Sequence, residues 1–581
     1  MKLRTALRGA VAIAALAPFV VPIVAPTMAD AETHSGERGR DGEVKIIYWQ
    51  APSIMNPFLS GGTKDAEAAS LVLEPLGRYD QEGNPVAFLA TEIPTIANGG
   101  VSEDLTSITW NIKPDLKWSD GTAFTSADVV FTAEYCMDPD GGCAQLAKFE
   151  GVETVEALDE LTVKVTFKEP KPNPYLPFMG GQSPILQAAQ FAECMGARAP
   201  ECTDANFNPI GTGPFTVKEF RPNDVITMEA NPHYRDPSKP AFATLTLKGG
   251  GDSAAAGRAV LETGEYDYAW NLLLAPEVIA NMAAAGKGTP VSAFGTLVER
   301  IEINLTDPSA DLPEGERSTV THPHPILSDG RVRKALSIAI DRDLLVEIGY
   351  GQAGRATCNV VPAPVMYASD NTDCMPQDVE RAKALLDEAG WTDSDGDGIR
   401  DKDGKKLSLL FQTSVNAVRQ DFQALIKQWW SDIGVETELR AIDGSVYFGG
   451  DPGSPDTFQK FYGDVGLFAN NFDGTDPEAY LAAYTCEKIP GPASQWQGEN
   501  INRFCDPAYD ELIAELGRTG DLNERGRIAK RLNDMITKDT DIVLPLVDRG
   551  RVSAHSNSLG GVILNTWDSE LWNVADWYRV K

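Results

Sequence analysis

Residues 208–235 read NPIGTGPFTVKEFRPNDVITMEANPHYR, and this stretch predicts more about the fold than any other. Two runs that alternate apolar and polar side chains flank the turn sequence Pro222-Asn223-Asp224, which is the pattern of a β-hairpin. A glycine corner at Gly211 and Gly213 opens the stretch. Taken by themselves, these residues predict a hairpin and nothing further.

The start of the chain has the features of a secretory leader. Basic residues precede an apolar run, and Ala29-Asp30-Ala31 fits a small-x-small cleavage site. Three prolines interrupt the apolar run, which is also shorter than the roughly 20 residues of a membrane-spanning helix. We therefore expect residues 1–31 to be a cleaved signal peptide. No cysteine lies near the cleavage site, so we expect a free periplasmic protein without a lipid anchor.

The net charge is strongly negative. The whole chain carries −33 at pH 7, and loss of residues 1–31 would leave the mature chain near −35. Nucleic acids and anionic membrane surfaces would repel a chain of this charge, so neither is expected as a partner. High solubility alone would also account for the acidity.

Eight cysteines fall into four close pairs. In chain order they are Cys136 and Cys143, Cys194 and Cys202, Cys358 and Cys374, and Cys486 and Cys505. An even number of cysteines in an exported chain predicts disulfides, although eight cysteines allow about 100 different pairings. We expect the sequential pairing, with each bond closing one short loop. A zinc site is disfavoured because the chain contains no C-x-x-C pair.

The chain is too long for one hydrophobic core, and 581 residues predict two or three domains. Residues 108–113, 161–168 and 301–306 alternate like half-buried strands. Helices are predicted from residue 126, with Ser126 as N-cap, from residue 379, with Asp378 as N-cap, and along two apolar stripes. The stripes are Phe422, Leu425, Ile426, Trp429 and Ile433, and Ile528, Leu532, Met535 and Ile536. This mixture indicates an α/β or α+β protein.

Five motifs follow one another along the chain in a recognisable order. They are LVLEPLGRYD (71–80), WNIKPDLKWSDGTAFTSADVVFTAEY (110–135), GTGPF (211–215), VRKALSIAIDRDLLVE (332–347) and ERAKALLDEAGW (380–391). Together they resemble the bacterial extracellular solute-binding proteins of family 5, the oligopeptide, dipeptide and nickel class. Those proteins are the capture subunits of ABC importers.

The resemblance implies an α/β, two-lobed periplasmic-binding-protein fold of type II with an extra inserted domain. The ligand would bind in a cleft between lobes that close about a hinge. The domains expected are lobe I from residues 32–80, 208–305 and 541–581, an inserted domain at 81–207, and lobe II at 306–540.

The resemblance also implies where the ligand is held. Family members that bind peptides carry an aspartate four residues before a proline, and it pairs with the α-ammonium of the peptide. Here that position is Asp473, before Pro477. A buried ammonium needs a carboxylate partner, which is the physical reason for the pairing. A plain turn at Asp473 and Gly474 is the alternative.

Further ligand contacts are expected on both sides of the cleft. Asn470, Asn471 and Phe472 precede Asp473, and Trp49 and Met55 lie in or beside the loop after the first strand. The side chains of Trp49 and Met55 could equally well belong to a hydrophobic core.

One departure from the family pattern bears on ligand size. Dipeptide receptors hold the ligand carboxylate with an arginine after a strand of the second lobe, and residues 414–416 contain none. The nearest, Arg419, is expected at the start of the next helix. Longer peptides or a different solute are therefore favoured over a tightly clamped dipeptide.

A separate acidic loop, DSDGDGIRDKDG at residues 393–404, follows a calcium-loop pattern. Its candidate ligands are Asp393, Asp395, Asp397, the carbonyl of Ile399, and Asp401. Gly404 stands where the bidentate glutamate is expected, so the alternatives are a structural calcium ion and an ordinary acidic turn.

These features predict a binding protein rather than an enzyme, with no required cofactor. A secreted hydrolase is the distant alternative, since the chain has no G-x-S-x-G and no H-E-x-x-H motif. An oligosaccharide or another solute is the alternative ligand to a peptide, and a chemoreceptor-coupled role is the alternative to transport. The expected partners are a peptide and the subunits of a membrane permease, and we expect a monomer.

Overall fold

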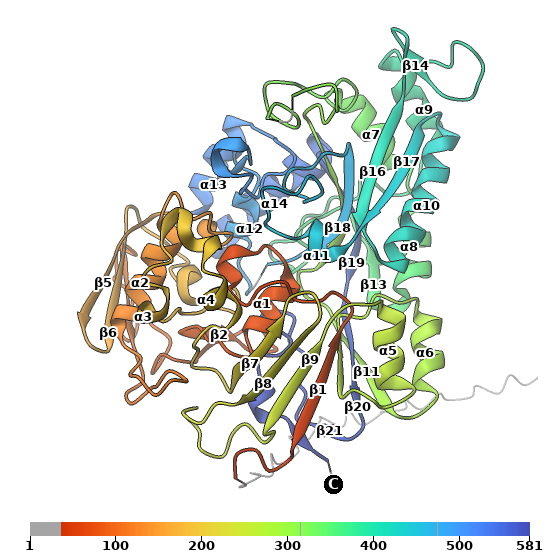
Figure 1. The fold of residues 1–581 in the computed structure, drawn as a ribbon. Helices are drawn as coiled ribbons and strands as arrows, with labels where there is room; N and C mark the ends of the chain where they lie inside the picture. Colours follow the sequence, from red (N-terminus) through yellow and green to blue (C-terminus); the bar gives the residue numbers. More distant parts are fainter. Residues whose placement is uncertain (1–36, 314, 473, 581) are drawn as a thin grey trace, which may run out of the picture. The chain divides into compact units, whose positions relative to one another are not determined.

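The computed structural model describes residues 37–313, 315–472 and 474–580 (Figure 1). The predicted leader at residues 1–31 and the predicted anchor Asp473 lie outside the described residues. Strands and helices are mixed along the chain, as expected for an α/β fold. Within the described ranges, no helix combines the length and the apolar character that crossing a bilayer requires.

Seven strands form the first sheet, with β1 at its centre (Figure 1). In spatial order they are β11 (Gly288–Ala293), β20 (Arg551–Ser556), β10 (Tyr268–Trp270), β1 (Glu43–Tyr48), β9 (Thr244–Lys248), β8 (Val225–Ala230) and β7 (Phe215–Arg221). Strand β1 runs parallel to both of its neighbours. The predicted hairpin is confirmed as the antiparallel pair β7 and β8, and Asn223 has a φ of 61° in its turn.

The glycine corner before this hairpin packs against the backbone at Val72. The amide of Gly213 donates to the carbonyl oxygen of Val72 over 2.8 Å. A Cβ added at Gly211 would lie 1.9 Å from that same oxygen. No carbon approaches a non-bonded oxygen so closely, so the glycine at position 211 of the GTGPF motif has a steric cause. It allows the hairpin to lie directly against the segment that follows α1 (Thr63–Ala69).

Six strands form the second sheet. In spatial order they are β13 (Gly354–Ala356), β19 (Val543–Arg549), β12 (Val298–Ile303), β18 (Val465–Asn470), β16 (Ser408–Ser414) and β17 (Glu436–Ile442). The chain crosses between the two sheets from β11 to β12 and again from β19 to β20. The domain boundaries stay predictions, but β12 and β19, which they place in lobe I, pair in the second sheet.

Residues 81–207, the predicted insertion, contain a three-stranded sheet. In spatial order its strands are β4 (Ser107–Asn111), β6 (Thr162–Phe167) and β5 (Val152–Asp159). The helix α2 (Ser126–Met137) packs on this sheet. Its N-cap is Thr125 rather than the predicted Ser126, because Thr125 and Asp128 exchange hydrogen bonds in a capping box.

The insertion shares its hydrophobic core with the first lobe. Phe58, Leu73 and Leu76, which precede the insertion, belong to the same buried cluster as Trp110 and Phe178 inside it. Because burial of apolar surface is the main source of cohesion between segments, this shared cluster holds the insertion against lobe I.

The second lobe contains the three helices that the sequence predicted, now α9 (Val379–Glu388), α10 (Ala417–Asp432) and α14 (Leu522–Asp534), together with several others. The others include α7 (Gly330–Ile338), α8 (Arg342–Gly349), α12 (Glu478–Ala482) and α13 (Pro507–Leu516). Asp378 caps α9 as predicted. On α10 the fully buried indole is Trp430, whereas the predicted Trp429 is only partly buried. Trp430 stacks on Phe411 and donates to the carbonyl of Leu336 over 3.0 Å.

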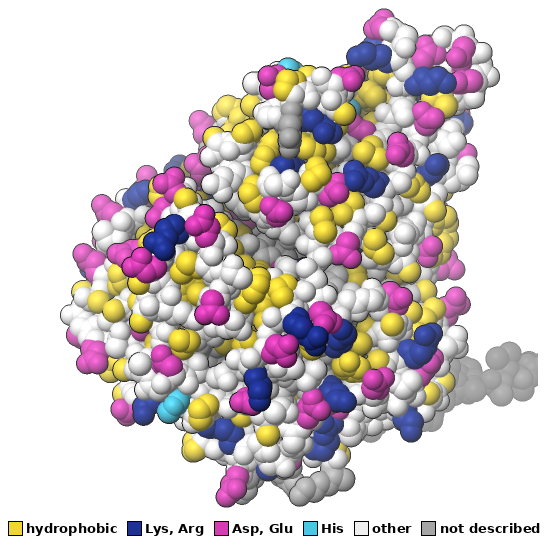
Figure 2. Space-filling model, in the orientation of Figure 1, with side chains coloured by type: hydrophobic (Ala, Val, Ile, Leu, Met, Phe, Trp, Pro, Cys, Tyr) yellow, Lys and Arg dark blue, Asp and Glu magenta, His cyan; other side chains and the backbone are white. Residues whose placement is uncertain are grey.

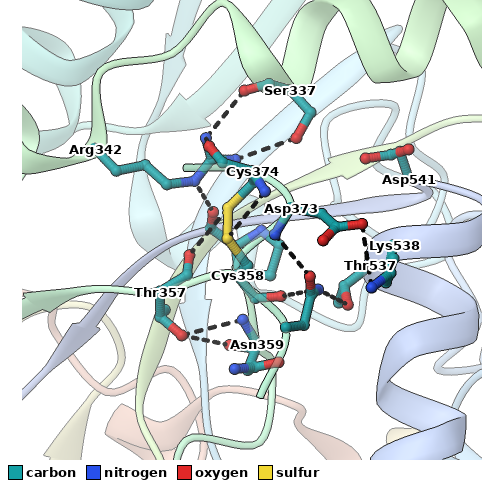
Figure 3. The surroundings of a disulfide bond; sticks show 12 residues. Ser337, Arg342, Thr357, Cys358, Asn359, Asp373, Cys374, Thr537, Lys538 and Asp541 are labelled. Carbon is teal, nitrogen blue, oxygen red and sulfur yellow. Dashed lines mark hydrogen bonds and ion pairs between the residues drawn. A yellow bond between two sulfur atoms is a disulfide. The ribbon is translucent and has the colours of Figure 1, made fainter. Parts of the chain in front are cut away.

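The four predicted disulfides are present, in the sequential pairing. Cys136–Cys143 and Cys194–Cys202 lie in the insertion, and the other two bonds lie in the second lobe. Figure 3 shows the surroundings of Cys358–Cys374, where Arg342 donates to the carbonyl of Cys374 over 3.0 Å. The loop closed by this bond is thus fixed to the start of α8.

Acidic side chains are spread over the face of the protein shown in Figure 2, with lysines and arginines interspersed among them. The negative charge therefore does not gather at one place on that face. This distribution fits the interpretation that net charge serves solubility.

Candidate functional site

Two adjoining cavities lie between the lobes. The larger has a volume of about 520 Å³ and the smaller about 80 Å³. They share the lining residues Gly61, Phe458, Phe468, Asn470 and Asn471, so together they form one cleft. The larger volume is within the range of pockets that hold small-molecule ligands, roughly 300–1,000 Å³.

The walls of the cleft come from all three predicted domains. The insertion contributes residues 138–148 to the larger cavity, the predicted lobe II contributes residues 479–501, and Tyr79 and strand β12, which the predicted boundaries assign to lobe I, line it as well. The smaller cavity is closed on one side by residues 61–64 and Trp270, and on the other by Leu297 and the end of β18. A ligand here would touch both lobes, as the two-lobed interpretation requires.

Three of the predicted ligand residues follow one another at the end of β18. Asn470 and Asn471 line both cavities, and Phe472 lines the larger one. The carbonyl of Phe472 accepts a hydrogen bond from Thr296 over 2.8 Å, which ties this loop to the crossing between the sheets. Asp473, the predicted anchor, is the next residue and lies outside the described residues.

The two predicted residues near the first strand have different environments. Trp49 lines the smaller cavity, and its indole N–H donates to the carbonyl of Asn271 over 2.7 Å. Met55 is fully buried in a hydrophobic cluster with Phe215 and Leu245 and lines neither cavity. The expectation that Met55 contacts ligand is therefore wrong for this structure, because the chain turns that side chain into the core of lobe I.

A buried ionic network forms the floor of the smaller cavity. Glu299 accepts two hydrogen bonds from Arg419, at 3.0 and 3.1 Å, and lies 3.1 Å from Nε of Arg549. Burial by itself would raise the pKa of Glu299, but Arg419 and Arg549 outweigh it and hold that pKa below its usual value. Arg419 begins α10 as expected. Its guanidinium is already paired with Glu299, so it is not free to act as a carboxylate clamp.

A second network lies on the lobe I side. Arg551 pairs with Glu67 at 2.7 Å and lies 3.7 Å from Glu570. Burial raises the pKa of Glu67 to about 7 despite the opposing charge of Arg551, and Glu570 raises it further. Sequence reasoning missed this group because Glu67 and Arg551 are far apart in the chain, and no local pattern connects them.

The back wall of the larger cavity carries a buried ion pair. Arg300 and Glu302, alternate residues of β12, are 2.6 Å apart. Arg300 also contacts the hydroxyl of Tyr480, and the hydroxyl of Tyr484 donates to Glu302 over 3.4 Å. Burial by itself would lower the pKa of Arg300, but the charge of Glu302 and the tyrosine hydroxyls outweigh it and raise that pKa above its usual value. The alternating pattern of β12 indicated a half-buried strand, but both of its faces are covered.

The acidic loop at residues 393–404 brings three carboxylates together. Oxygen atoms of Asp393, Asp395 and Asp397 lie within 4.8 Å of one another, and all three residues are exposed. Asp397 pairs with Lys406 and accepts from the amide of Ile399, and Asp401 accepts from Ser394. Asp397 and Asp401 thus have partners within the protein, and the binding of a structural calcium ion stays a prediction.

Comparison with known proteins places the chain among binding proteins. Residues 84–490 match the bacterial extracellular solute-binding proteins, family 5 Middle. A glutathione-binding protein GsiB of Salmonella paratyphi A is 25% identical over 465 residues, covering 79% of this chain and 81% of that protein.

Solved structures show the same fold. The oligopeptide-binding protein AppA from Bacillus subtilis, in complex with a nonapeptide, has a TM-score of 0.78 at 22% identity and covers 94% of this chain and 100% of its own. NikZ from Campylobacter jejuni, in complex with Ni(L-His), has a TM-score of 0.76 at 22% identity, covering 93% and 100%. The two-lobed periplasmic-binding-protein fold is thereby confirmed. The chain belongs to family 5 of the bacterial extracellular solute-binding proteins.

Proposed function

We propose that this protein captures a peptide in the periplasm and delivers it to the permease of an ABC importer. The observation that carries the proposal is the cleft of about 520 Å³ between the lobes, lined by aromatic side chains and by charged groups of both signs. A peptide offers apolar side chains, an ammonium and a carboxylate, and such a lining complements all three. One relative is a glutathione-binding protein and one structural neighbour is an oligopeptide-binding protein, which supports the same class of ligand.

The mechanism is binding without chemistry, since family 5 proteins bind solutes and are not enzymes. Two chain crossings, from β11 to β12 and from β19 to β20, connect the sheets and are the natural hinge. Closure about them would complete the contacts of the cleft around the ligand. Asp473 remains our proposed partner for the ammonium of the peptide, with Asn470 and Asn471 beside it.

A thermal-shift screen of the mature protein tests the ligand class. Di- to octapeptides, oligosaccharides and nickel chelates are compared, because a ligand that binds the folded state raises the melting temperature. We expect free-amine peptides to raise it, with a smaller effect after N-acetylation and in Asp473→Asn. A shift with sugars or chelates alone would refute the peptide ligand but not the family.

The location is a separate part of the proposal. An exported protein would lose residues 1–31, and it would carry the disulfides seen in the structure. Mass spectrometry of the protein from an osmotic-shock fraction should give a chain that begins near residue 32. An uncleaved chain in the membrane fraction would contradict a free periplasmic protein.

A further inference from the structure

Glu499, a carboxylate in the wall of the larger cavity, has no partner among the described residues. Glu499 lines that cavity and is exposed to it. Among the residues that the structure describes, none forms a hydrogen bond or an ion pair with its side chain. Two neighbouring carboxylates of the same wall are engaged: Glu302 pairs with Arg300, and Glu487 lies 3.4 Å from Lys488. The carboxylate of Asp140, on the insertion side of the cavity, likewise has no partner among the described residues.

The backbone that carries Glu499 is held firmly. The amide of the next residue, Asn500, donates to the carbonyl of Lys488 over 3.1 Å. The buried side chain of Asn500 donates to the carbonyls of Thr485 and Phe504, at 2.9 and 2.6 Å. The Cys486–Cys505 disulfide closes the loop that contains Lys488, Glu499, Asn500 and Phe504, and Thr485 directly precedes it. Glu499 is thus placed on a fixed support, which reduces the entropy lost when a ligand binds.

The surroundings make the ionised form of Glu499 costly. Protein surrounds the cavity, and the resulting burial raises the pKa of Glu499 to about 7. Lys488 and then Lys148 act in the opposite direction, and Glu150 adds to the rise. Lys488 divides its charge between Glu150, at 3.9 Å, and Glu487. The two lysines therefore do not offset the effect of burial on Glu499. A cationic group of a ligand that entered the cavity would stabilise the ionised carboxylate.

We propose that Glu499 is a ligand-binding residue that pairs with a cationic group of the captured peptide. The class of group is an ammonium or a guanidinium, and its source is the amino terminus of the peptide or a basic side chain. This inference rests on the proposed peptide-binding function and deepens it. It differs from the role proposed for Asp473, because Glu499 comes from the braced loop between α12 and α13 rather than from the end of β18.

Calorimetric titration of the mature protein with four tripeptides tests the inference. The peptides are Ala-Lys-Ala, Ala-norleucine-Ala, in which the side chain keeps a similar length without charge, and the N-acetylated form of each. The variants are Glu499→Gln and a charge-matched control, Glu193→Gln, whose side chain is 85% exposed and lies outside both cavities. We expect Glu499→Gln to bind the relevant peptide about 10- to 100-fold more weakly, the range for a hydrogen bond to a charged group. The control should bind like wild type.

The four peptides identify the source of the charge. A loss confined to the two lysine peptides assigns the basic side chain to Glu499. A loss confined to the two free-amine peptides assigns the amino terminus. Equal affinities of wild type and Glu499→Gln for every peptide that binds would overturn the inference and leave the proposed function standing. Failure of wild type to bind these tripeptides and every di- to octapeptide of the thermal-shift screen would refute the proposed function, and the inference with it.

The pH profile gives a readout that a merely structural role would not move. A cationic ligand requires the ionised carboxylate, so wild-type affinity should fall by up to about tenfold per pH unit below the pKa. Between pH 8 and pH 6 the affinity of Glu499→Gln should stay flat. Without ligand, Glu499→Gln should melt at a temperature equal to or above that of wild type at pH 8, because the substitution removes a carboxylate whose ionised form is costly in the folded state. Parallel pH profiles of the two forms would count against Glu499.

Discussion

Glu299 is completely buried beside the place where the chain crosses between the two sheets, and we expect Glu299→Gln to destabilise the protein severely. Its carboxylate is the shared partner of Arg419 and Arg549, and it also accepts from the hydroxyl of Tyr350 over 2.9 Å. Glutamine has nearly the same shape, so packing is preserved. It offers one acceptor oxygen without charge, and its NH₂ group would face a guanidinium.

The magnitude follows from what the two arginines lose. Both are buried, with exposed fractions of 3% for Arg419 and 2% for Arg549. Removing one member of a buried ion pair typically costs about 3–5 kcal/mol, because the other charge remains buried without compensation. Arg419 keeps one contact, a hydrogen bond to Ser414, and Arg549 keeps weak contacts with Asn271. We therefore expect a loss of about 3–5 kcal/mol in the free energy of unfolding.

Urea unfolding followed by tryptophan fluorescence measures this loss as a shift of the transition midpoint. The control is Glu219→Gln, which removes a hairpin ion pair of 3.5 Å to Arg221 whose side chains are both more than half exposed. That change should leave the midpoint unaltered, because such pairs contribute little. A loss below about 1 kcal/mol in Glu299→Gln would refute the reasoning that the network depends on Glu299.

Three further predictions concern other parts of the chain. Gly211→Ala places a carbon 1.9 Å from the carbonyl oxygen of Val72. We therefore expect less folded protein on expression and a melting temperature lowered by several degrees. An unchanged melting curve would contradict the steric explanation. If the acidic loop binds calcium, adding calcium should raise the melting temperature, chelation should reverse the rise, and Asp395→Asn should abolish it, whereas no shift in wild type would leave an ordinary acidic turn. Burial raises the pKa of the Asp541 carboxyl to about 6 despite the nearby Lys334. Between about pH 4 and pH 6 the folded protein therefore keeps the carboxyl protonated, whereas the unfolded chain has lost that proton. The free energy of unfolding should fall as pH rises through this interval. The urea midpoint of Asp541→Asn should therefore rise relative to that of wild type as pH increases from about 4 to 6. A difference between the two midpoints that does not change with pH would refute the raised pKa of Asp541.

The sequence predicted those features whose causes are local. The hairpin at residues 208–235 depends on turn residues and alternation, and the helix beginning after Asp378 depends on a cap and an apolar stripe. The disulfides were predicted because each pair is close in sequence. The family resemblance supplied the arrangement of lobes, which local patterns could not.

The ionic parts of the cleft could not be predicted, because their members are distant in the chain. Glu67 and Arg551 are separated by 484 residues, and Glu299 meets Arg419 from 120 residues away. Glu499 gave no signal either, since its significance is the lack of a partner inside a cavity. Met55 shows the opposite error, because a position after the first strand does not determine whether a side chain turns toward the cleft or the core.

The disulfides have a consequence for how the protein is made. Each bond joins cysteines that are 7 to 19 residues apart, and none of the four rings overlaps another along the sequence. A chain that emerges amino terminus first, from a ribosome or an export channel, presents both members of one pair before the next pair appears. Order of emergence by itself therefore favours the native connectivity, and an oxidant should suffice for correct pairing without an isomerase to reshuffle the bonds.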